Sequence, residues 1–314
     1  MGAVCTKNSD CESDRCQGGL CYYSSSCKPI KEDGPPNFQN LNIVFVGSGF
    51  VNKESFEEKV NEMFSLIQTY DPFSANNQLF MAYFVNTLVG SYCSLHCQNR
   101  STLLCCDLDM VYALTAECFQ PGTHIQTIVV ENTGEYGGAG YFNANVATTT
   151  LHEYGGRLAV HELGHSLFQL GDEYESSKDT STKANCDNDG CPKFSDLIGH
   201  FDEVTCDTKG CTENSYFIGE RSLMDSLDLP LGHVNTRYTC CTFLAFTGEF
   251  PSYCERFDFQ PNDLREYCDK DYQGHYDSDN TTLRSAFIRS LPDIPPPLTE
   301  DIYLFNNPRD SLYR

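Results

Sequence analysis

The chain has 314 residues, with 21 Lys and Arg against 44 Asp and Glu, so its formal net charge is −23. A chain this acidic repels nucleic acids and anionic membrane surfaces, and we expect neither as a partner. Hydrophobic residues make up 40% of the chain, which is enough for a sizeable core and argues against global disorder. Since no stretch reaches the roughly 18 uncharged apolar residues of a membrane-spanning helix, we predict no transmembrane segment.

The chain contains 18 cysteines, an unusual number for a cytosolic protein of this length. Disulfides formed in an oxidising compartment are the natural explanation, and the sequons at Asn99 and Asn280 agree with a secreted or lumenal glycoprotein. Because no apolar signal segment follows Met1, a secreted protein would be numbered from inside a longer precursor. The alternative is a lipid anchor, since residues 1–6 also fit a myristoylation pattern with Gly2 as the acceptor.

Three regions are expected along the chain. Residues 1–34 form a cysteine-rich module with little apolar material, so disulfides must hold it together. Its five cysteines are an odd number, so at least one of them pairs with the main body or stays unpaired. A Gly-Pro-Pro linker leads into a domain over 35–250, and an acidic, Pro-rich C-terminal extension follows over 251–314.

Buried strands alternate with helices after the linker. Apolar runs predict strands over 41–46, 79–89 and 125–130. A helix with a capping box from Ser55 to Glu58 follows the first strand, and its apolar residues from Phe56 to Ile67 repeat at helical spacing, which predicts one buried face. A second, short helix is expected over residues 109–118. The order strand, helix, strand, helix, strand predicts an α/β fold with helices packed on a sheet.

The next two segments are polar. Glycines stand at positions 134, 137, 138 and 140, but the Lys-Ser/Thr of a phosphate-binding loop is missing, so we interpret this segment as a mobile or tightly turned loop. Residues 141–150 are rich in threonine, and we expect them to form a polar strand at the sheet edge.

A helix predicted over 157–170 contains the candidate metal-binding and catalytic residues. Leucines repeat on one face of it, and His161 and His165 project from a common face one turn apart. Two imidazoles in this arrangement can hold one Zn²⁺ at about 2.0–2.1 Å from each nitrogen. Glu162 is rotated by roughly 100° from the first histidine. It is therefore poorly placed to bind the metal but well placed to take a proton from a zinc-activated water.

A catalytic zinc normally takes a third protein ligand. Gly171 follows the helix and can adopt the left-handed conformation that reverses the chain. Such a turn brings Asp172 or Glu173 to the metal. We favour Asp172 because the turn is short, with Glu173 as the alternative, and the other carboxylate would then accept a hydrogen bond from a ligand histidine. Tyr174 either donates a hydrogen bond to the oxyanion or packs in the core.

Adjacent cysteines constrain the disulfide pattern further down the chain. Cys105 and Cys106 must bridge to different partners, as must Cys240 and Cys241. The near-identical segments 186–191 and 206–211 each begin and end with cysteine, and we expect each to be a small disulfide-closed loop.

The run HELGHSLFQLGDEY, from His161 to Tyr174, closely resembles the active-site segment of the IgA-peptidase-type metallopeptidases, which are zincins close to the metzincins. Residues 43–50 are similar to the opening strand and turn of that family, and residues 121–138 to its later strand and Gly-rich loop. The segment 222–225 is similar to the methionine turn beneath a metzincin-like zinc site. The similarity covers about residues 38–240.

This resemblance implies an α+β, zincin-like fold, with a mixed twisted sheet and a packed active-site helix. It implies one zinc ion with ligands His161 and His165 and the general base Glu162, but not immunoglobulin as the substrate. Phe168 and Gly171 stand where metzincins have a glycine and a third histidine, which leaves the third ligand to a carboxylate. In zincins the substrate lies antiparallel to an edge strand above the active helix, and residues 141–150 are the candidate by resemblance.

These features together predict a zinc metalloendopeptidase with the metal on His161, His165 and Asp172, the base Glu162, and a protein or peptide as substrate. Two alternatives stay open. A structural or adhesive extracellular protein would retain the zincin scaffold without activity. A latent peptidase would have its cleft blocked by the N-terminal module, the C-terminal extension or a cysteine thiolate, and the two terminal regions are also candidate contacts for other chains.

Overall fold

The computed structural model describes residues 16–17, 20–21, 26–30, 41–74, 79–119, 125–142, 144–174, 183–206, 208–211, 216–259, 263–269 and 302–303. Gly2, the Gly-Pro-Pro linker, Asn280 and most of the two predicted terminal regions lie outside these ranges. Within the described ranges, no helix is both long and apolar enough to cross a bilayer.

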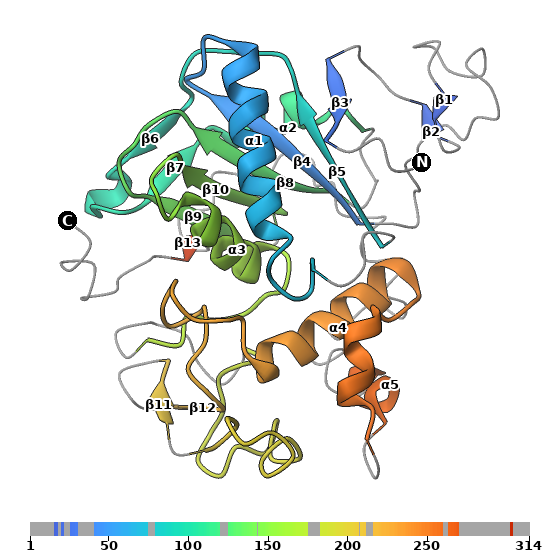
Figure 1. Ribbon diagram of the computed structural model, residues 1–314. Helices are drawn as coiled ribbons and strands as arrows, with labels where there is room; N and C mark the ends of the chain where they lie inside the picture. The colour runs from blue at the N-terminus through green and yellow to red at the C-terminus, as the bar shows by residue number, and fades with distance from the viewer. Residues whose placement is uncertain are drawn as a thin grey trace.

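A seven-stranded mixed sheet forms the upper half of the molecule in Figure 1. Its strands are β3 (Cys27–Pro29), β4 (Leu41–Ser48), β5 (Phe80–Val85), β8 (Ile125–Glu131), β9 (Gly138–Tyr141), β10 (Val146–Thr150) and β13 (Ile302–Tyr303). They lie in the order β13-β9-β10-β8-β4-β5-β3. The central strands β10, β8, β4 and β5 are parallel, whereas β3 is antiparallel to β5 and β9 is antiparallel to both β10 and β13. The predicted α/β fold with a mixed sheet is confirmed.

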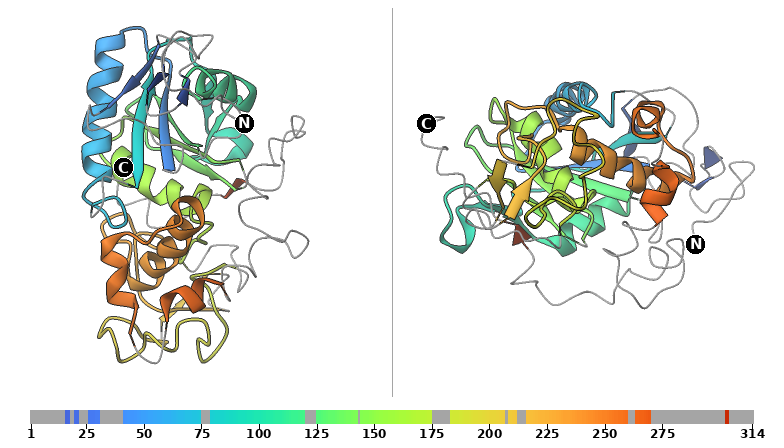
Figure 2. Two further views of the ribbon diagram at one scale, coloured as in Figure 1. Left: turned by 90° about the vertical axis from the view of Figure 1, so that its right-hand side faces the viewer. Right: turned by 90° about the horizontal axis from the view of Figure 1, so that it is seen from below.

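Helices cover both faces of the sheet, which explains why β4 is buried along its whole length. Ile43 and Phe45 pack in the core with α1 (Lys53–Ile67) and α3 (Gly155–Ser166). Val44 and Val46 point the opposite way, into the core beside α2 (Leu108–Thr115). Figure 2 shows α1 and α2 on opposite sides of the sheet in its left view.

Helix α1 begins earlier than its sequence signal indicated. The Asn52 side chain caps it by accepting a hydrogen bond from the backbone N–H of Ser55 at 2.7 Å. The Ser55–Glu58 capping box was therefore a wrong prediction, because both residues lie inside the first turns of the helix. The predicted apolar face is confirmed, and it consists of the buried residues Phe56, Val60, Met63, Phe64 and Ile67.

The glycine-rich segment is the largest correction to the predicted elements. Gly138 and Gly140 belong to strand β9, not to a loop, and residues 141–150 contain only the end of β9 and the inner strand β10. A Cβ added at Gly140 would lie 2.5 Å from the Cβ of His165, so only glycine lets the strand pack this close to α3. The glycines therefore serve close packing, and β9 lies between β10 and the short edge strand β13.

The lower half of the molecule in Figure 1 consists mainly of residues 183–269. Its elements are the hairpin β11 (Thr208–Gly210) and β12 (Tyr216–Ile218), α4 (His233–Thr247), a 3₁₀ helix (Ser252–Phe257) and the short helix α5 (Leu264–Tyr267). Disulfides Cys240–Cys254 and Cys241–Cys268 fasten α4 to the segment that follows it. The prediction that adjacent cysteines bridge to different partners is confirmed here.

The two cysteine loops of this lower half are joined to each other. Cys186 pairs with Cys211 and Cys191 with Cys206, so the expectation of two separately closed loops is wrong. Their Cα separations of 6.2 and 5.8 Å suit disulfides, which shows that the two segments lie side by side. The two disulfides are nested, with Cys186–Cys211 enclosing Cys191–Cys206, and they tie residues 186–191 to residues 206–211 at both ends.

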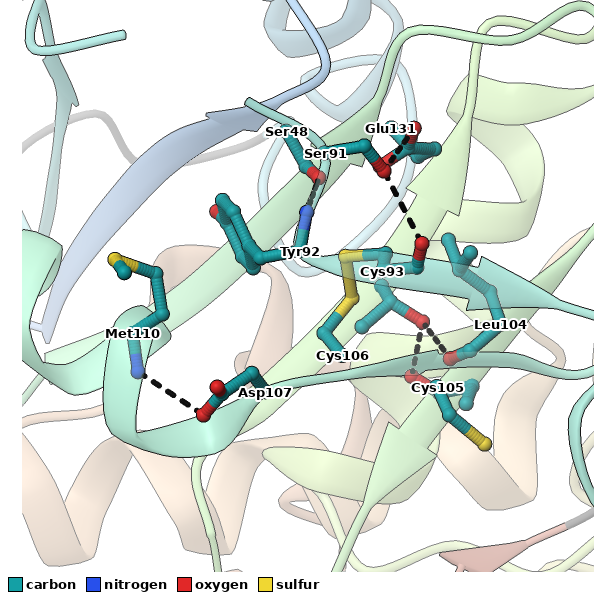
Figure 3. Close-up of a disulfide and its surroundings, with 12 residues drawn as sticks. Ser48, Ser91, Tyr92, Cys93, Leu104, Cys105, Cys106, Asp107, Met110 and Glu131 are labelled. Atoms are coloured by element: carbon teal, nitrogen blue, oxygen red, sulfur yellow. Dashed lines mark hydrogen bonds between the residues drawn. A yellow bond between two sulfur atoms is a disulfide. The ribbon is translucent and has the colours of Figure 1, made fainter. Parts of the chain in front are cut away.

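Further disulfides tie the outer segments to the sheet. Cys27 pairs with Cys118, so one cysteine of the N-terminal module does bond to the main body. The hairpin of β6 (Cys93–Leu95) and β7 (Leu104–Cys106) contains the disulfides Cys93–Cys106 and Cys97–Cys105. Figure 3 shows how this hairpin is attached: the backbone N–H of Tyr92 donates to Ser48 Oγ at 3.0 Å, and Ser91 Oγ donates to Glu131 Oε1 at 3.1 Å. It is thereby fixed to the ends of β4 and β8.

A 3₁₀ turn (Cys97–Asn99) and two short strands are the remaining described elements. The strands are β1 (Cys16–Gln17) and β2 (Leu20–Cys21), which pair antiparallel within the predicted N-terminal module.

Candidate metal centre and active site

Helix α3 presents His161 and His165 on one face, as their spacing predicted. Their Nε2 atoms lie 3.1 Å apart. The Nδ1 atom of His161 lies 3.0 Å from the carbonyl oxygen of Leu223, and that of His165 lies 2.8 Å from the carbonyl oxygen of Leu170. Because a carbonyl only accepts, each Nδ1 carries the proton and each Nε2 keeps its lone pair for a ligand.

Asp172 completes this group. Its Oδ1 atom lies 3.2 Å from the Nε2 atoms of both His161 and His165, and all three side chains are buried. Among the described residues, this is the one cluster of His, Cys, Asp and Glu side chains whose atoms converge closely enough to hold a metal ion.

The donor separations fit a zinc ion. Ligand atoms about 2.0–2.1 Å from a tetrahedral zinc lie roughly 3.3 Å from one another. The observed separations of 3.1–3.2 Å are close to that value. Burial acts to raise the pKa of Asp172, but the adjacent imidazoles of His165 and His161 hold that pKa well below its usual range. The ionised carboxylate is the form in which an Asp side chain binds a metal ion.

The turn after α3 brings Asp172 to the histidines, but not through Gly171. Gln169 adopts the left-handed conformation with φ 57°, and the N–H of Leu170 donates to the carbonyl of Gly164 at 2.9 Å. Gly171 is instead held by Asn185, whose amide side chain bonds to its N–H and its carbonyl, both at 2.8 Å. A side chain from a distant loop thus fixes the backbone directly before Asp172.

Tyr174 acts on the same carboxylate. It is buried, and its hydroxyl donates to Asp172 Oδ2 at 2.7 Å. Asp172 therefore keeps one oxygen beside the histidines while Tyr174 orients the other. Of the two roles considered for this tyrosine, a donor to the oxyanion or a core residue, burial supports the core position, but with a specific polar contact.

Glu173 lies apart from the histidines, in a buried polar cluster. Its Oε1 accepts from the amides of Asn185 at 3.0 Å and Asn235 at 2.9 Å, and its Oε2 accepts from Ser222 Oγ at 2.6 Å. Burial raises the pKa of Glu173 to about 8, against the effect of these hydrogen bonds. The carboxylate joins the turn after α3 to the segment at 222 and to helix α4. Glu173 does not accept a hydrogen bond from a ligand histidine, because the Nδ1–H groups of His161 and His165 both donate to backbone carbonyls.

The segment 222–225 lies against α3, where the resemblance placed it. Met224 is fully buried, and its sulfur would lie 2.6 Å from a Cβ added at Gly164. The carbonyl of Met224 accepts from the N–H of Glu173 at 2.9 Å. Gly164, which costs helix propensity, therefore makes room for the methionine that packs beneath the two histidines.

Glu162 lies between α3 and β9. Its Oε1 is 2.9 Å from the Cβ position of Gly138, and its Oε2 is 3.2 Å from that of Gly140. Burial raises its pKa to about 8, and the neighbouring His161 and a hydrogen bond from the Gly140 backbone oppose this rise. The carboxylate thus lies against strand β9, beside the cluster of His161, His165 and Asp172.

Sequence reasoning missed the side chains that hold the site in place. Asn185 and Asn235 carry no motif and lie in segments that local patterns do not link to α3. Gln126, on β8, donates to Ser166 Oγ at 3.0 Å, and that hydroxyl donates to the carbonyl of Glu162 at 2.9 Å. A glutamine in a strand with the apolar run Ile128–Val130 was the one available signal, because a buried amide needs a partner.

Comparison with known families agrees with this geometry. A family model described as IgA Peptidase M64 matches residues 84–189, from β5 through α3 to the loop beyond Asp172. The match is narrower than the region of resemblance, since strand β4 and the Met224 segment lie outside it. No curated protein matches the chain. The matched region contains His161, His165 and Asp172, and it confirms the resemblance to the IgA-peptidase-type family and indicates a peptidase of the metal-dependent class.

Proposed function

We propose that the chain is a zinc-dependent metalloendopeptidase in which His161, His165 and Asp172 hold the metal and Glu162 is the general base. The observation that carries this proposal is the convergence of three buried ligand atoms, 3.1–3.2 Å apart, beside a second buried acid, Glu162. Two imidazoles and one carboxylate are a donor set that suits zinc, and three protein ligands leave a position for water and substrate.

The chain supplies the other parts of peptide hydrolysis. Zinc bound at this site provides a Lewis acid that activates water and stabilises negative charge on the peptide carbonyl. Glu162 accepts the proton of the attacking water and delivers it to the leaving amine. The Gly140 N–H orients the Glu162 carboxylate. The hydrogen bonds from both Nδ1 atoms to backbone carbonyls orient the imidazoles.

The disulfides indicate the cellular compartment of the proposed enzyme. Seven disulfides join described cysteines, which fits a secreted or lumenal protein. Asn99 is exposed, so its sequon is accessible to glycosylation. We place the end of the catalytic domain near residue 269 rather than at 250, because Leu264 and Cys268 pack in the same core as α3.

The test is digestion of a complex peptide library by the wild-type chain, a chelator-treated sample and the Glu162→Gln variant. We expect cleavage by the wild-type chain alone, with a loss of roughly 10²–10⁴-fold in Glu162→Gln because the general base is removed. Glu153→Gln is the matched control, since Glu153 is exposed and directly precedes the same helix. It should cleave as the wild type does.

Metal analysis makes the result decisive. The wild type and both variants should each hold one zinc ion, because neither glutamate is a proposed ligand. A wild-type chain that binds zinc and cleaves nothing would refute the enzyme and favour the structural or adhesive alternative. Full activity in Glu162→Gln would instead remove Glu162 from the mechanism.

A further inference from the structure

The outer edge of β9 is where the proposed base meets the sheet. On this edge the N–H of Gly138 donates to the carbonyl of Thr102 at 3.1 Å, away from β10. Alternate residues of a strand direct their N–H groups to the same edge. The N–H of Gly140 therefore also points outward, and it bonds to the Glu162 carboxylate. A chain paired with β9 at this point lies directly beside Glu162.

Such an edge binds extended peptides. An unpaired strand edge takes up another chain through backbone hydrogen bonds, with little demand on its sequence. The segment before β7 covers only one end of β9, through the bridge between Leu103 and Gly138. Gly140 and Tyr141 form the remainder of the outer edge, and a substrate of the proposed peptidase would have to pair there to reach Glu162.

Strand β13 already occupies this position. It pairs antiparallel with β9, with Ile302 opposite Tyr141 and Tyr303 opposite Gly140. Figures 1 and 2 show it in red, next to β9 and close to α3. The register places a backbone segment of the C-terminal extension opposite the residue whose N–H reaches the proposed base.

We propose that β13 occupies the substrate-binding edge of the active site, so that the C-terminal extension competes with peptide substrates and restrains the enzyme. The inference rests on the proposed peptidase function and identifies its regulation. It favours latency through strand competition over latency through a thiolate. None of the described cysteines is free, and the metal-binding cluster of described residues contains no cysteine.

The test is the double variant Ile302→Pro/Tyr303→Pro in the full chain. Neighbouring residues of a strand point their N–H groups to opposite edges, so two adjacent prolines remove whichever donor faces β9. Asp310→Pro/Ser311→Pro is the matched control, with two prolines in the same extension but outside β13. Both variants leave the proposed metal ligands and base unchanged.

Two measurements are made on each protein. In Ile302→Pro/Tyr303→Pro the KM for a peptide substrate should fall about fivefold or more at unchanged kcat, because a tethered competitor acts at an effective concentration of roughly millimolar. Amide hydrogen exchange at residues 138–141 should also be roughly tenfold faster, since β9 loses its outer partner. A synthetic peptide of residues 298–307 should restore the wild-type KM, and a scrambled peptide should not.

The outcomes separate the two proposals. An unchanged KM together with unchanged exchange at β9 would overturn the inference and leave the peptidase intact. If neither protein cleaves peptides while exchange at β9 still accelerates, the strand pairing is real and the proposed peptidase function fails. A KM change of equal size in Asp310→Pro/Ser311→Pro would also overturn the inference, because the effect would not depend on pairing with β9.

Discussion

The two parts of the candidate site are held in different ways. Helix α3 carries two histidines and Glu162, and it is positioned by apolar packing against a sheet that is buried on both faces. The segment that completes the site runs from Asp172 to α4. Its described residues contain one short hairpin, β11–β12, and are held by disulfides and by hydrogen bonds to buried polar groups. Packing is enough to place a helix. The position of a single carboxylate requires cross-links and directional contacts as well.

The two parts meet at Gly164 and Met224. The methionine belongs to the same core as α3, so the lower segment also gains from apolar burial. Its polar contacts determine where its backbone lies. The carbonyl of Leu223 accepts a hydrogen bond from His161 Nδ1, and the carbonyl of Met224 accepts one from the N–H of Glu173. Stability in the upper half should therefore depend on side-chain volume, and geometry in the lower half on specific bonds.

The largest effect should come from the core of the sheet. Phe45 is fully buried on β4, and its ring packs edge-on against Phe64 at 6.3 Å between centroids. Phe45→Ala should lower the free energy of unfolding by about 3–5 kcal/mol, because it leaves a cavity in a close-packed layer. Denaturant unfolding measures this loss. Val51→Ala is the control, since Val51 is 96% exposed and should change stability by less than about 0.5 kcal/mol. Equal losses in both would break the comparison.

The second-largest effect should come from the disulfides that join residues 186–191 to residues 206–211. Cys191→Ser/Cys206→Ser removes a bond that closes 15 residues of chain. The loss should be about 3 kcal/mol by loop entropy. We expect it to appear as faster amide hydrogen exchange over 183–211, with β4 unaffected. Removing Cys97–Cys105, which spans 8 residues in the β6–β7 hairpin, is the control and should leave 183–211 unchanged. Equal acceleration in β4 would show that the two halves unfold as one unit.

The smallest effect should come from one hydroxyl. Tyr174→Phe removes the donor at 2.7 Å from Asp172 and leaves α3 and its histidines in place. Zinc affinity should fall about tenfold to hundredfold, as for other groups that orient a metal ligand. Competition with a chromophoric chelator measures the change. Tyr112→Phe removes a hydroxyl that donates to the Ala144 carbonyl at 3.2 Å, and it should leave zinc affinity unaltered. An unchanged affinity in Tyr174→Phe would refute the role of Tyr174 in holding Asp172.

Local sequence patterns predicted the elements that are buried on a continuous face. The apolar run of β4 and the periodic face of α1 report burial residue by residue, so both were found with errors only at their ends. The pair of histidines was found for the same reason, because a spacing of four residues on a helix has one geometric outcome.

Local sequence patterns gave wrong predictions where the role of a residue depends on a contact with a segment far away in the sequence. Gly138 and Gly140 suggested a turn, yet they are glycines because α3 passes within contact distance of their backbone. The cysteines at 186, 191, 206 and 211 suggested two separate loops. The two segments instead lie side by side, so each cysteine of one segment pairs with a cysteine of the other. The cap of α1 was misplaced because Ser55 and Asn52 are both good capping residues, and the start of the helix decides between them.

The sequence by itself therefore determined the helix, its two histidines, the glutamate between them and the family resemblance, since all of these are written within about fourteen consecutive residues. Only the tertiary structure shows that Asp172, and not Glu173, lies beside the two histidines. Asn185 and Tyr174 hold the first beside the histidines, while Ser222 and Asn235 draw the second away. The tertiary structure likewise brought Tyr303 opposite Gly140. The physical reason is the same in each case: hydrogen bonds between segments far apart in the chain depend on how the chain folds back, and no local period records them.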